Sequence, residues 1–329
     1  YHSLRPQNMF LTWWGDQLIE TNVEECNVID AKTGKKKLLF TLDQINKWAG
    51  SDGDARQVRT LTDATFPYPD KPVVAIGNRR AFVLVDFKAR QLVWQDSISA
   101  QDAYDWSKDS RATAFVEDNQ LFVADADGNK HQLTTDGSRD IVYGKSVHRD
   151  EFGITKGTFW SPDGQRLAFY RMNQSMVADY PQVDILPLPK DVDNGASIAT
   201  MEPDKYPMAG TDTHVVTVGV FDLKTGKTIY LDTPTNSEEA PIMENDATVY
   251  FTNIAWSPDA KTIYMFELNR DQNDCRLISY DAATGERLQE LYREISDKYV
   301  EPLHPIRFLP WDASMFIMQS RKDGYNHLY

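Results

Sequence analysis

The chain has 329 residues and a formal net charge of −14, with 41% apolar and 26% charged residues. This composition is typical of a globular protein, and it excludes a disordered chain, a collagen and a small disulfide scaffold. The acidic balance disfavours nucleic acid as a partner, because phosphate backbones are bound by basic surfaces. The apolar runs are far shorter than the ~20 residues that cross a bilayer, so we expect no transmembrane helix.

Two turn motifs recur along the chain. The first reads Trp-Ser-Pro-Asp-Gly/Ala at 160–164 and again at 256–260, between two apolar runs each time. Proline fixes φ at a turn position and Asp or Gly closes the turn, so each copy predicts a hairpin. The second motif places an Asp and a short polar turn, often ending in Gly, between two apolar runs. Its copies begin at Asp30, Asp86, Asp222 and Asp281, with a looser one at Asp125.

Together the two motifs predict four-stranded antiparallel units. The Ser-Pro-Asp turn precedes the Asp turn, and four-stranded units repeated every ~40–50 residues are typical of β-propeller blades. In chain order we predict blades over residues 8–42, 66–97, 111–135, 156–234, 249–292 and 304–329. The last of these stops at Tyr329 in mid-blade. The sequence therefore predicts an all-β propeller of about six blades, truncated at the C-terminal end of this chain.

Three segments depart from the blade pattern. Leu42–Ala49 has apolar residues at helical spacing and Gly50 as a possible C-cap, which predicts a helix. A second helical turn is predicted over residues 100–106. Residues 172–213 carry five prolines and little periodicity. We interpret them as an insertion that projects from the fourth blade.

Motifs of common catalytic and cofactor sites are missing from the sequence. It has no Gly-x-Ser-x-Gly elbow, no P-loop and no Gly-x-Gly-x-x-Gly, and its six histidines show no zinc spacing. Asp52–Asp54 and Asp125–Gly128 resemble the start of a calcium loop, but neither has Glu at the twelfth position, which favours simple turns. We therefore predict no cofactor and no metal. Cys26 and Cys275 lie far apart in the sequence, which leaves open whether they pair.

One acidic segment, residues 146–153, breaks the turn pattern. It contains Asp150 and Glu151, followed by Phe152 and then, about nine residues further, the first Trp-Ser-Pro motif. Two interpretations remain open at this point. The segment is either a solvated connection between the third and fourth blades or a loop that binds a ligand.

This arrangement of an acidic pair, an apolar residue and Trp-Ser-Pro-Asp-Gly resembles the propeller of the dipeptidyl peptidase IV group, within the prolyl oligopeptidase family. Further runs look like its bacterial prolyl tripeptidyl peptidase branch. They are residues 156–162, 168–172, 206–211, 214–219, 299–305 and 319–329. The similarity is strongest from about residue 140 to the end.

The resemblance implies an eight-bladed propeller that caps an α/β-hydrolase domain in the full-length protein. The Ser-Asp-His triad of this serine peptidase family lies in that domain, which this chain lacks, so we expect the chain alone to be inactive. The full-length enzyme would remove di- or tripeptides that end in proline. Its partners would be peptides with a free amino terminus and its own hydrolase domain, and a homodimer is possible.

A secreted or periplasmic location in a bacterial cell envelope is also expected. The family resemblance points to it, and the chain begins at Tyr1 rather than at a methionine. We therefore expect a processed product from which an export signal could have been removed.

The same resemblance assigns roles to single residues. Glu151 immediately precedes the apolar residue, as the anchoring glutamate of the family does, so we expect it to bind the substrate's amino terminus. Asp150 either shares this role or pairs with Arg149. The arginine that the family places near the substrate carbonyl matches Arg79 or Arg80 only by rough position. We expect the following aromatic residues to lie in the blade core: Trp160, Phe169, Tyr170 and Trp256.

An alternative hypothesis comes from a different functional class. In it, the chain is a stand-alone propeller that binds a protein partner or a glycan and is not an enzyme. A self-sufficient binder needs a closed ring, so the half blade before Tyr329 argues against it. The coding sequence beyond Tyr329 discriminates between the two hypotheses.

Overall fold

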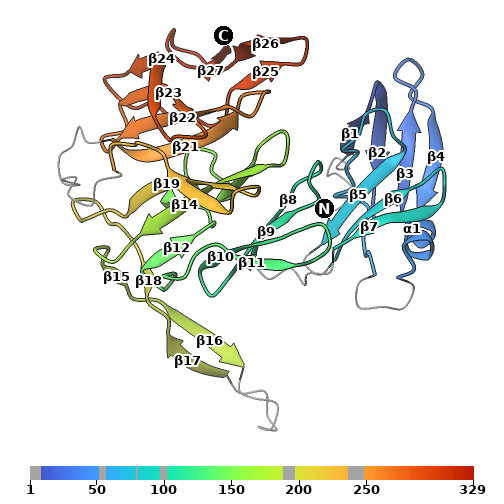
Figure 1. Ribbon diagram of the computed structural model, residues 1–329, viewed down its shortest axis with the longest axis horizontal. Coiled ribbons are helices and arrows are strands. Elements are labelled where there is room, and N and C mark those ends of the chain that lie inside the picture. Colours follow the sequence, from blue (N-terminus) through green and yellow to red (C-terminus); the bar gives the residue numbers. More distant parts are fainter. Residues whose placement is uncertain (1–8, 52–56, 79–80, 97–101, 188–196, 236–247) are drawn as a thin grey trace, which may run out of the picture. The chain divides into compact units, whose positions relative to one another are not determined.

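The computed structural model describes residues 9–51, 57–78, 81–96, 102–187, 197–235 and 248–329. It divides into two compact units, residues 1–104 with 124–130 and residues 105–123 with 131–329. Antiparallel sheets dominate both units (Figure 1). Each unit is described by itself below.

The first unit contains two antiparallel sheets in which the strands follow each other in sequence order. One consists of β1 (Phe10–Trp14), β2 (Gln17–Thr21), β3 (Glu25–Ile29) and β4 (Lys36–Thr41). The other consists of β5 (Val73–Asn78), β6 (Ala81–Asp86) and β7 (Gln91–Gln95). Their buried side chains form one core, in which the ring of Phe87 packs edge-on against Trp14 with centroids 5.0 Å apart.

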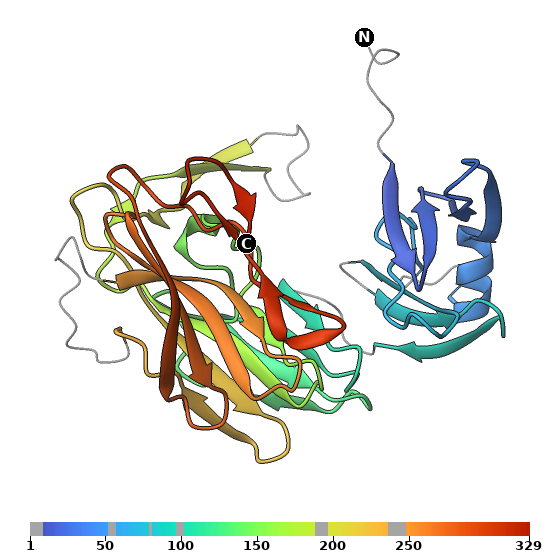
Figure 2. The ribbon, with the colours of Figure 1, turned by 90° about the horizontal axis from the view of Figure 1, so that it is seen from above.

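The helix predicted at residues 42–49, between β4 and β5 in the sequence, is confirmed as α1 (Leu42–Ala49). Figure 2 shows it beside the strands of the first unit. The backbone N–H of Gln44 donates to Thr41 Oγ1 at 3.3 Å, and the Gln44 side chain accepts from the N–H of Thr41 at 3.0 Å. This capping box satisfies two of the free donors at the helix start. At the other end Gly50 has φ +68°, a conformation in which glycine avoids the steric cost of a side chain.

The helical turn predicted over residues 100–106 is wrong. Residues 102–106 form the strand β8 (Asp102–Trp106), while 100 and 101 lie outside the described residues. β8 joins a four-stranded sheet with β9 (Thr113–Glu117), β10 (Gln120–Ala124) and β11 (Lys130–Gln132). Tyr104 and Trp106 suit a strand, and the neighbouring strand supplies ladder hydrogen bonds that a short isolated helix lacks.

Two larger sheets form the body of the second unit. The first, called the insertion sheet, has the order β12 (Ile141–Tyr143), β14 (Arg166–Asn173), β19 (Val215–Asp222) and β20 (Lys227–Tyr230), with β13 (Thr158–Trp160) paired to β14. The second, called the hairpin sheet, has the order β21 (Thr248–Trp256), β22 (Thr262–Asn269), β23 (Asp274–Asp281) and β24 (Arg287–Ile295). The hairpin sheet has the predicted four antiparallel strands, whereas the insertion sheet has a fifth strand, β13, beside β14.

One core of this unit lies between the two sheets. Val218 of the insertion sheet and Met265 of the hairpin sheet belong to one cluster of buried apolar residues. Of the aromatic residues expected in the core, Phe169 and Tyr170 are fully buried, whereas Trp160 and Trp256 are half-buried.

The Ser-Pro-Asp motif forms the same turn in both sheets. Ser161 Oγ donates to Asp163 Oδ1 at 2.5 Å and accepts the N–H of Arg166 at 2.9 Å. In the second copy, Ser257 Oγ donates to Asp259 Oδ1 at 2.7 Å and accepts the N–H of Thr262 at 2.9 Å. The side chains of the motif thus close the turn that the proline begins.

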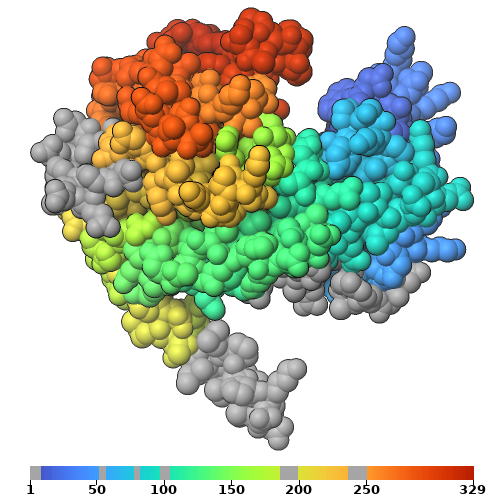
Figure 3. Space-filling view, viewed as in Figure 1, coloured from blue at the N-terminus to red at the C-terminus, as the bar shows by residue number. Residues whose placement is uncertain are grey.

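Between β14 and β19 the chain leaves the insertion sheet and forms two short antiparallel pairs. β15 (Asp179–Tyr180) pairs with β18 (Asp204–Lys205), and β16 (Val183–Pro187) pairs with β17 (Ser197–Met201). The β16–β17 hairpin projects from the body of the second unit, as the ribbon and the space-filling view show (Figures 1 and 3). The insertion was predicted over residues 172–213, but residues 172 and 173 end β14 and β19 begins at Val215, so the segment of residues 174–214 is called the insertion below.

The chain ends in two short antiparallel pairs. β25 (Arg307–Leu309) pairs with β26 (Asp312–Ile317), and β27 (Gln319–Ser320) pairs with β28 (His327–Leu328). Cys26 and Cys275 are free and buried, each in the core of its own unit. No helix among the described residues is long and apolar enough to cross a membrane.

Candidate functional site

Asp150 and Glu151 lie on a tight turn between β12 and β13. Its centre is the single-turn 3-10 helix η2 (His148–Asp150), in which φ is +54° at His148, +58° at Arg149 and +63° at Asp150. A left-handed backbone costs an L-residue about 1–2 kcal/mol, and none of these residues is glycine. Contacts around the turn must therefore hold it in this conformation.

Buried groups anchor the turn on both sides of the two carboxylates. On one side His148 is buried, its Nε2 accepts the N–H of Phe251 at 3.4 Å, and its Nδ1 lies 2.9 Å from Nε2 of His214. On the other side Phe152 is buried, and its carbonyl accepts from Nδ2 of Asn253 at 3.0 Å. The carboxylates between these anchors are exposed.

The histidine pair is uncharged at neutral pH. Because His148 Nε2 accepts a hydrogen bond, its proton lies on Nδ1, which donates to His214. Burial, and then the neighbouring His214, holds the pKa of His148 well below 6.5. Burial lowers the pKa of His214 to about 4, with smaller contributions from the charges of Arg149 and Arg270. The strained turn therefore rests on a neutral buried hydrogen bond.

Arg149, at the middle of the turn, points its charge at the insertion. Its Nη1 lies 2.5 Å from Oδ2 of Asp204, and its guanidinium lies 4.9 Å from the ring centroid of Tyr206. Its ion-pair partner is therefore Asp204 and not Asp150, whose pairing with Arg149 was one of the two alternatives from the sequence.

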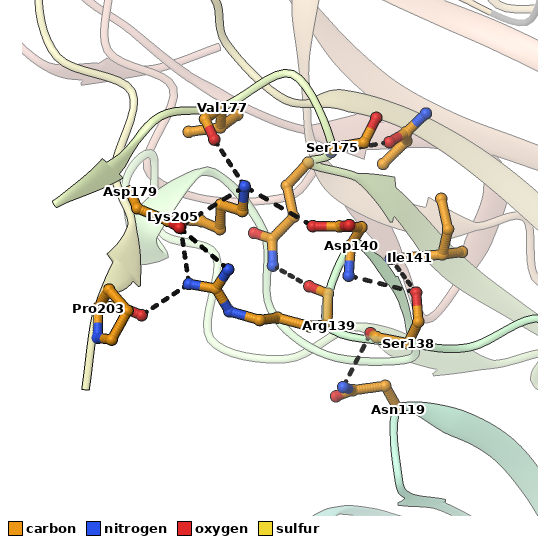
Figure 4. A network of polar contacts seen from close by, with 12 residues as sticks. Asn119, Ser138, Arg139, Asp140, Ile141, Ser175, Val177, Asp179, Pro203 and Lys205 are labelled. Atoms are coloured by element: carbon orange, nitrogen blue, oxygen red, sulfur yellow. Dashed lines mark hydrogen bonds and ion pairs between the residues drawn. The ribbon is translucent and has the colours of Figure 1, made fainter. Parts of the chain in front are cut away.

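A polar network fastens the base of the insertion beside the turn (Figure 4). Arg139 Nη2 donates to Asp179 Oδ1 at 2.7 Å and to the carbonyl of Pro203 at 2.8 Å. Lys205 Nζ donates to the carbonyl of Val177 at 2.8 Å and lies 3.5 Å from Asp179. Strand β18, which carries Asp204, is thus held at the residue on either side.

The two carboxylates line different cavities. Glu151 lines a cavity of about 450 Å³ and Asp150 one of about 490 Å³, while His148, Arg149 and His214 line both. Among the residues that the structure describes, neither carboxylate has a side-chain hydrogen bond or ion pair. Each is therefore available to a ligand from its own side of the turn.

Part of the wall of the Glu151 cavity comes from two connections that lie far apart in the sequence. Residues 206–210 of the insertion and residues 270–272 between β22 and β23 both line the Glu151 cavity. Arg270 Nη2 donates to the carbonyl of Thr211, which ties the two connections together. The sequence predicted none of these roles. The sequence repeat could have indicated that these two connections lie close together, because equivalent strand ends of neighbouring sheets lie on the same edge.

This arrangement suits the binding of a small cationic group. A carboxylate without a partner accepts strong charge-assisted hydrogen bonds from an ammonium. Within the described part of the chain, no group of three or more His, Cys, Asp or Glu side chains could hold a metal ion. Arg79 and Arg80, the candidates for the arginine near the substrate carbonyl, lie outside the described residues, as do Asp52–Asp54.

Comparisons with known proteins identify the family of this chain. A family model described as the dipeptidyl peptidase IV N-terminal region matches residues 77–329. The chain belongs to this family. As a member of the dipeptidyl peptidase IV N-terminal family, it is similar to proteins named probable dipeptidyl-aminopeptidase B from two fungi. Identity is 26% over 84% of this chain for the protein of Emericella nidulans and 28% over 80% for that of Talaromyces marneffei.

Two solved structures are similar over nearly the whole chain. A putative dipeptidyl aminopeptidase IV from Bacteroides ovatus is 41% identical, with a TM-score of 0.79, over 98% of this chain and 42% of that protein. Dipeptidyl peptidase 4 from Porphyromonas gingivalis is 22% identical, with a TM-score of 0.66, over 99% of this chain and 45% of that protein, and shows the shared fold. The predicted fold class, an all-β propeller with four-stranded antiparallel blades, is confirmed.

The chain spans 32% of the length of each of the two fungal proteins.

Proposed function

We propose that this chain is the part of a proline-specific serine exopeptidase that gates the substrate and recognises its amino terminus. The observation that carries the proposal is the Glu151 carboxylate, which lines a cavity of about 450 Å³ and has no partner among the described residues. The family match and the peptidase names of the relatives support it.

The physical argument starts from the charge of a free amino terminus. An α-amino group has a pKa near 8, so it is mostly cationic at neutral pH. A carboxylate ~4 Å away gains ~4 kcal/mol of Coulomb energy at an effective dielectric of 20, before desolvation. Such a contact fixes how far a peptide enters the site and so determines which bond is cleaved. The position of Glu151 would therefore determine the length of the released di- or tripeptide.

The proposal includes the rest of the enzyme. The chain has no Gly-x-Ser-x-Gly elbow, so we propose that an α/β-hydrolase domain of the full-length protein supplies the Ser-Asp-His triad. We propose that about six blades and the insertion belong to the domain that recognises the substrate. A secreted or periplasmic enzyme of a bacterial cell envelope is part of the same proposal, and homodimerisation of the full-length protein stays a prediction.

The test is Glu151→Gln in the full-length enzyme, which keeps the shape of the side chain and removes its charge. We expect kcat/KM for a substrate with a free amino terminus to fall about 30-fold to several thousand-fold, because losing the partner of a desolvated charge costs ~2–5 kcal/mol. The matched control is Asp150→Asn on the same turn. Since Asp150 lines the other cavity, we expect a smaller effect.

A substrate with an acetylated amino terminus separates recognition from folding. It carries no charge, so the parent enzyme should cleave it poorly and Glu151→Gln should barely change its rate. If both substrates lose activity in equal proportion, Glu151 supports the shape of the turn and is not the anchor. A full-length protein without a hydrolase domain would favour the alternative hypothesis of a non-enzymatic propeller that binds a protein or a glycan.

A further inference from the structure

Arg149 is a potential competitor for the substrate at the proposed anchor. It is two residues from Glu151 and lines the same cavity. A guanidinium stays protonated at all ordinary pH values, and its planar fork matches a carboxylate. An unrestrained Arg149 could therefore pair with Glu151 and occupy the position of a substrate ammonium.

The structure holds this guanidinium elsewhere. Its Nη1 lies 2.5 Å from Asp204 Oδ2, and its Cζ lies over the ring of Tyr206, 4.9 Å from the ring centroid. The Arg149 side chain is 43% exposed, so packing alone does not immobilise it. The contacts with Asp204 and Tyr206 are therefore what keeps the charge on the side of the insertion.

Asp204 is itself held in a fixed position. It lies on β18, where it pairs with Tyr180 of β15 in the backbone register. The residues before and after it are fastened, since Pro203 accepts from Arg139 and Lys205 donates to Val177 (Figure 4). The insertion thus holds the Asp204 carboxylate in a fixed position next to the turn.

We infer that Asp204 is a positioning residue that keeps Arg149 away from Glu151, so that the Glu151 carboxylate stays free for the substrate's amino group. The inference rests on the proposed function of Glu151 and adds a residue that acts through another. It also gives the insertion a role in substrate affinity, because β18 belongs to it.

The test is a pair of comparisons in the full-length enzyme. Asp204→Asn is made in the parent and in an Arg149→Gln background, and KM and kcat are measured with a substrate that has a free amino terminus. With Arg149 present, we expect KM to rise about fivefold with little change in kcat, because an exposed ion pair is worth up to ~1 kcal/mol. Without Arg149, the same substitution should change KM less than twofold.

Asp179→Asn is the matched control. Asp179 lies in the same two-stranded sheet and pairs with Arg139 at 2.7 Å, and it is not a member of the pair between Arg149 and Asp204. We expect it to leave KM within twofold of the parent. If Asp179→Asn raises KM as much as Asp204→Asn does, a loosened insertion explains both and the inference is wrong.

Two further outcomes are distinguishable. If Asp204→Asn raises KM equally in both backgrounds while Glu151→Gln abolishes the preference for free amino termini, only the inference about Asp204 is overturned. If Glu151→Gln leaves that preference intact, the proposed function fails and the inference fails with it. A fivefold rise that disappears in the Arg149→Gln background supports the inference.

Discussion

The insertion sheet and the hairpin sheet share a central pair of antiparallel strands and differ in the connection that joins these two strands. In both, the second and third strands are eight residues long, as in β14 and β19 and in β22 and β23. The hairpin sheet joins them by residues 270–273, whereas the insertion sheet joins them by residues 174–214. The strands still pair in regular antiparallel register in both sheets.

This difference separates the structural role of the repeat from its chemical role. Burial and ladder hydrogen bonds fix the strands, so the connection at their ends can vary in length at small cost. Both connections nevertheless line the cavity of Glu151. The repeat therefore determines where a connection stands, and the residues of the connection determine what it binds.

The largest expected effect is the response to acid of the long connection in the insertion sheet, which ends at His214, next to β19. The pKa of His214 is about 4 in the folded protein, below its usual 6.5, so the unfolded chain binds more protons between these values. The stabilisation is complete above pH 6.5 and is lost as the pH falls towards 4, by about 3 kcal/mol in total. Urea unfolding at pH 7, 6 and 5 should show a steeper loss for the parent than for His214→Gln. Parallel pH profiles would contradict this assignment.

A substitution at the Ser-Pro-Asp turn of the insertion sheet should have the next largest effect. Gly164 has φ +67°, and a Cβ there would lie 2.6 Å from Ser107 Oγ and 2.8 Å from the nitrogen of Ser110. Gly164→Ala adds both backbone strain and a steric clash, so we expect a loss of about 2–4 kcal/mol in the free energy of unfolding. Urea denaturation measures it. A loss below ~0.5 kcal/mol would show that the turn rearranges freely.

The reciprocal substitution in the hairpin sheet should have a small effect of opposite sign. Ala260 occupies the equivalent turn position with φ +60°, which disfavours any residue with a Cβ. Ala260→Gly relieves this strain but makes the unfolded chain more flexible, and we expect a net gain of about 0.5 kcal/mol. The control is Ala89→Gly in an exposed turn, which should lose stability. A loss at position 260 like that at 89 would mean that the two Ser-Pro-Asp turns are not equivalent.

Much of the fold could be predicted because its signals are local. The turn at Ser161 and the helix before Gly50 are closed by side chains within a few residues, so their motifs are visible in the sequence. The strand at residues 102–106 was missed because a neighbouring strand, and not its own sequence, decides its conformation. The predictions were reliable where the residues that stabilise an element lie close to it in the sequence.

The site was only partly predictable for the same reason. Asp150 and Glu151 are visible as an acidic pair, but nothing local predicts a left-handed turn without glycine at residues 148–150. That conformation depends on His214 and Phe251, which follow much later in the chain. The pair between Arg149 and Asp204 likewise joins segments that only the folded insertion brings together.

The tryptophans of the two Ser-Pro-Asp motifs lie at junctions between neighbouring sheets, where their fluorescence reports on unfolding. Trp160 Nε1 donates to the carbonyl of Asp105 on β8, and Trp256 Nε1 donates to the carbonyl of Phe159 on β13, each at 3.0 Å. Each indole thus bridges its own sheet to the sheet that precedes it in the sequence. In repeat proteins, such junctions between neighbours determine how far unfolding of one unit spreads to the next. The emission of each indole during unfolding would therefore report whether its junction opens separately or together with the rest.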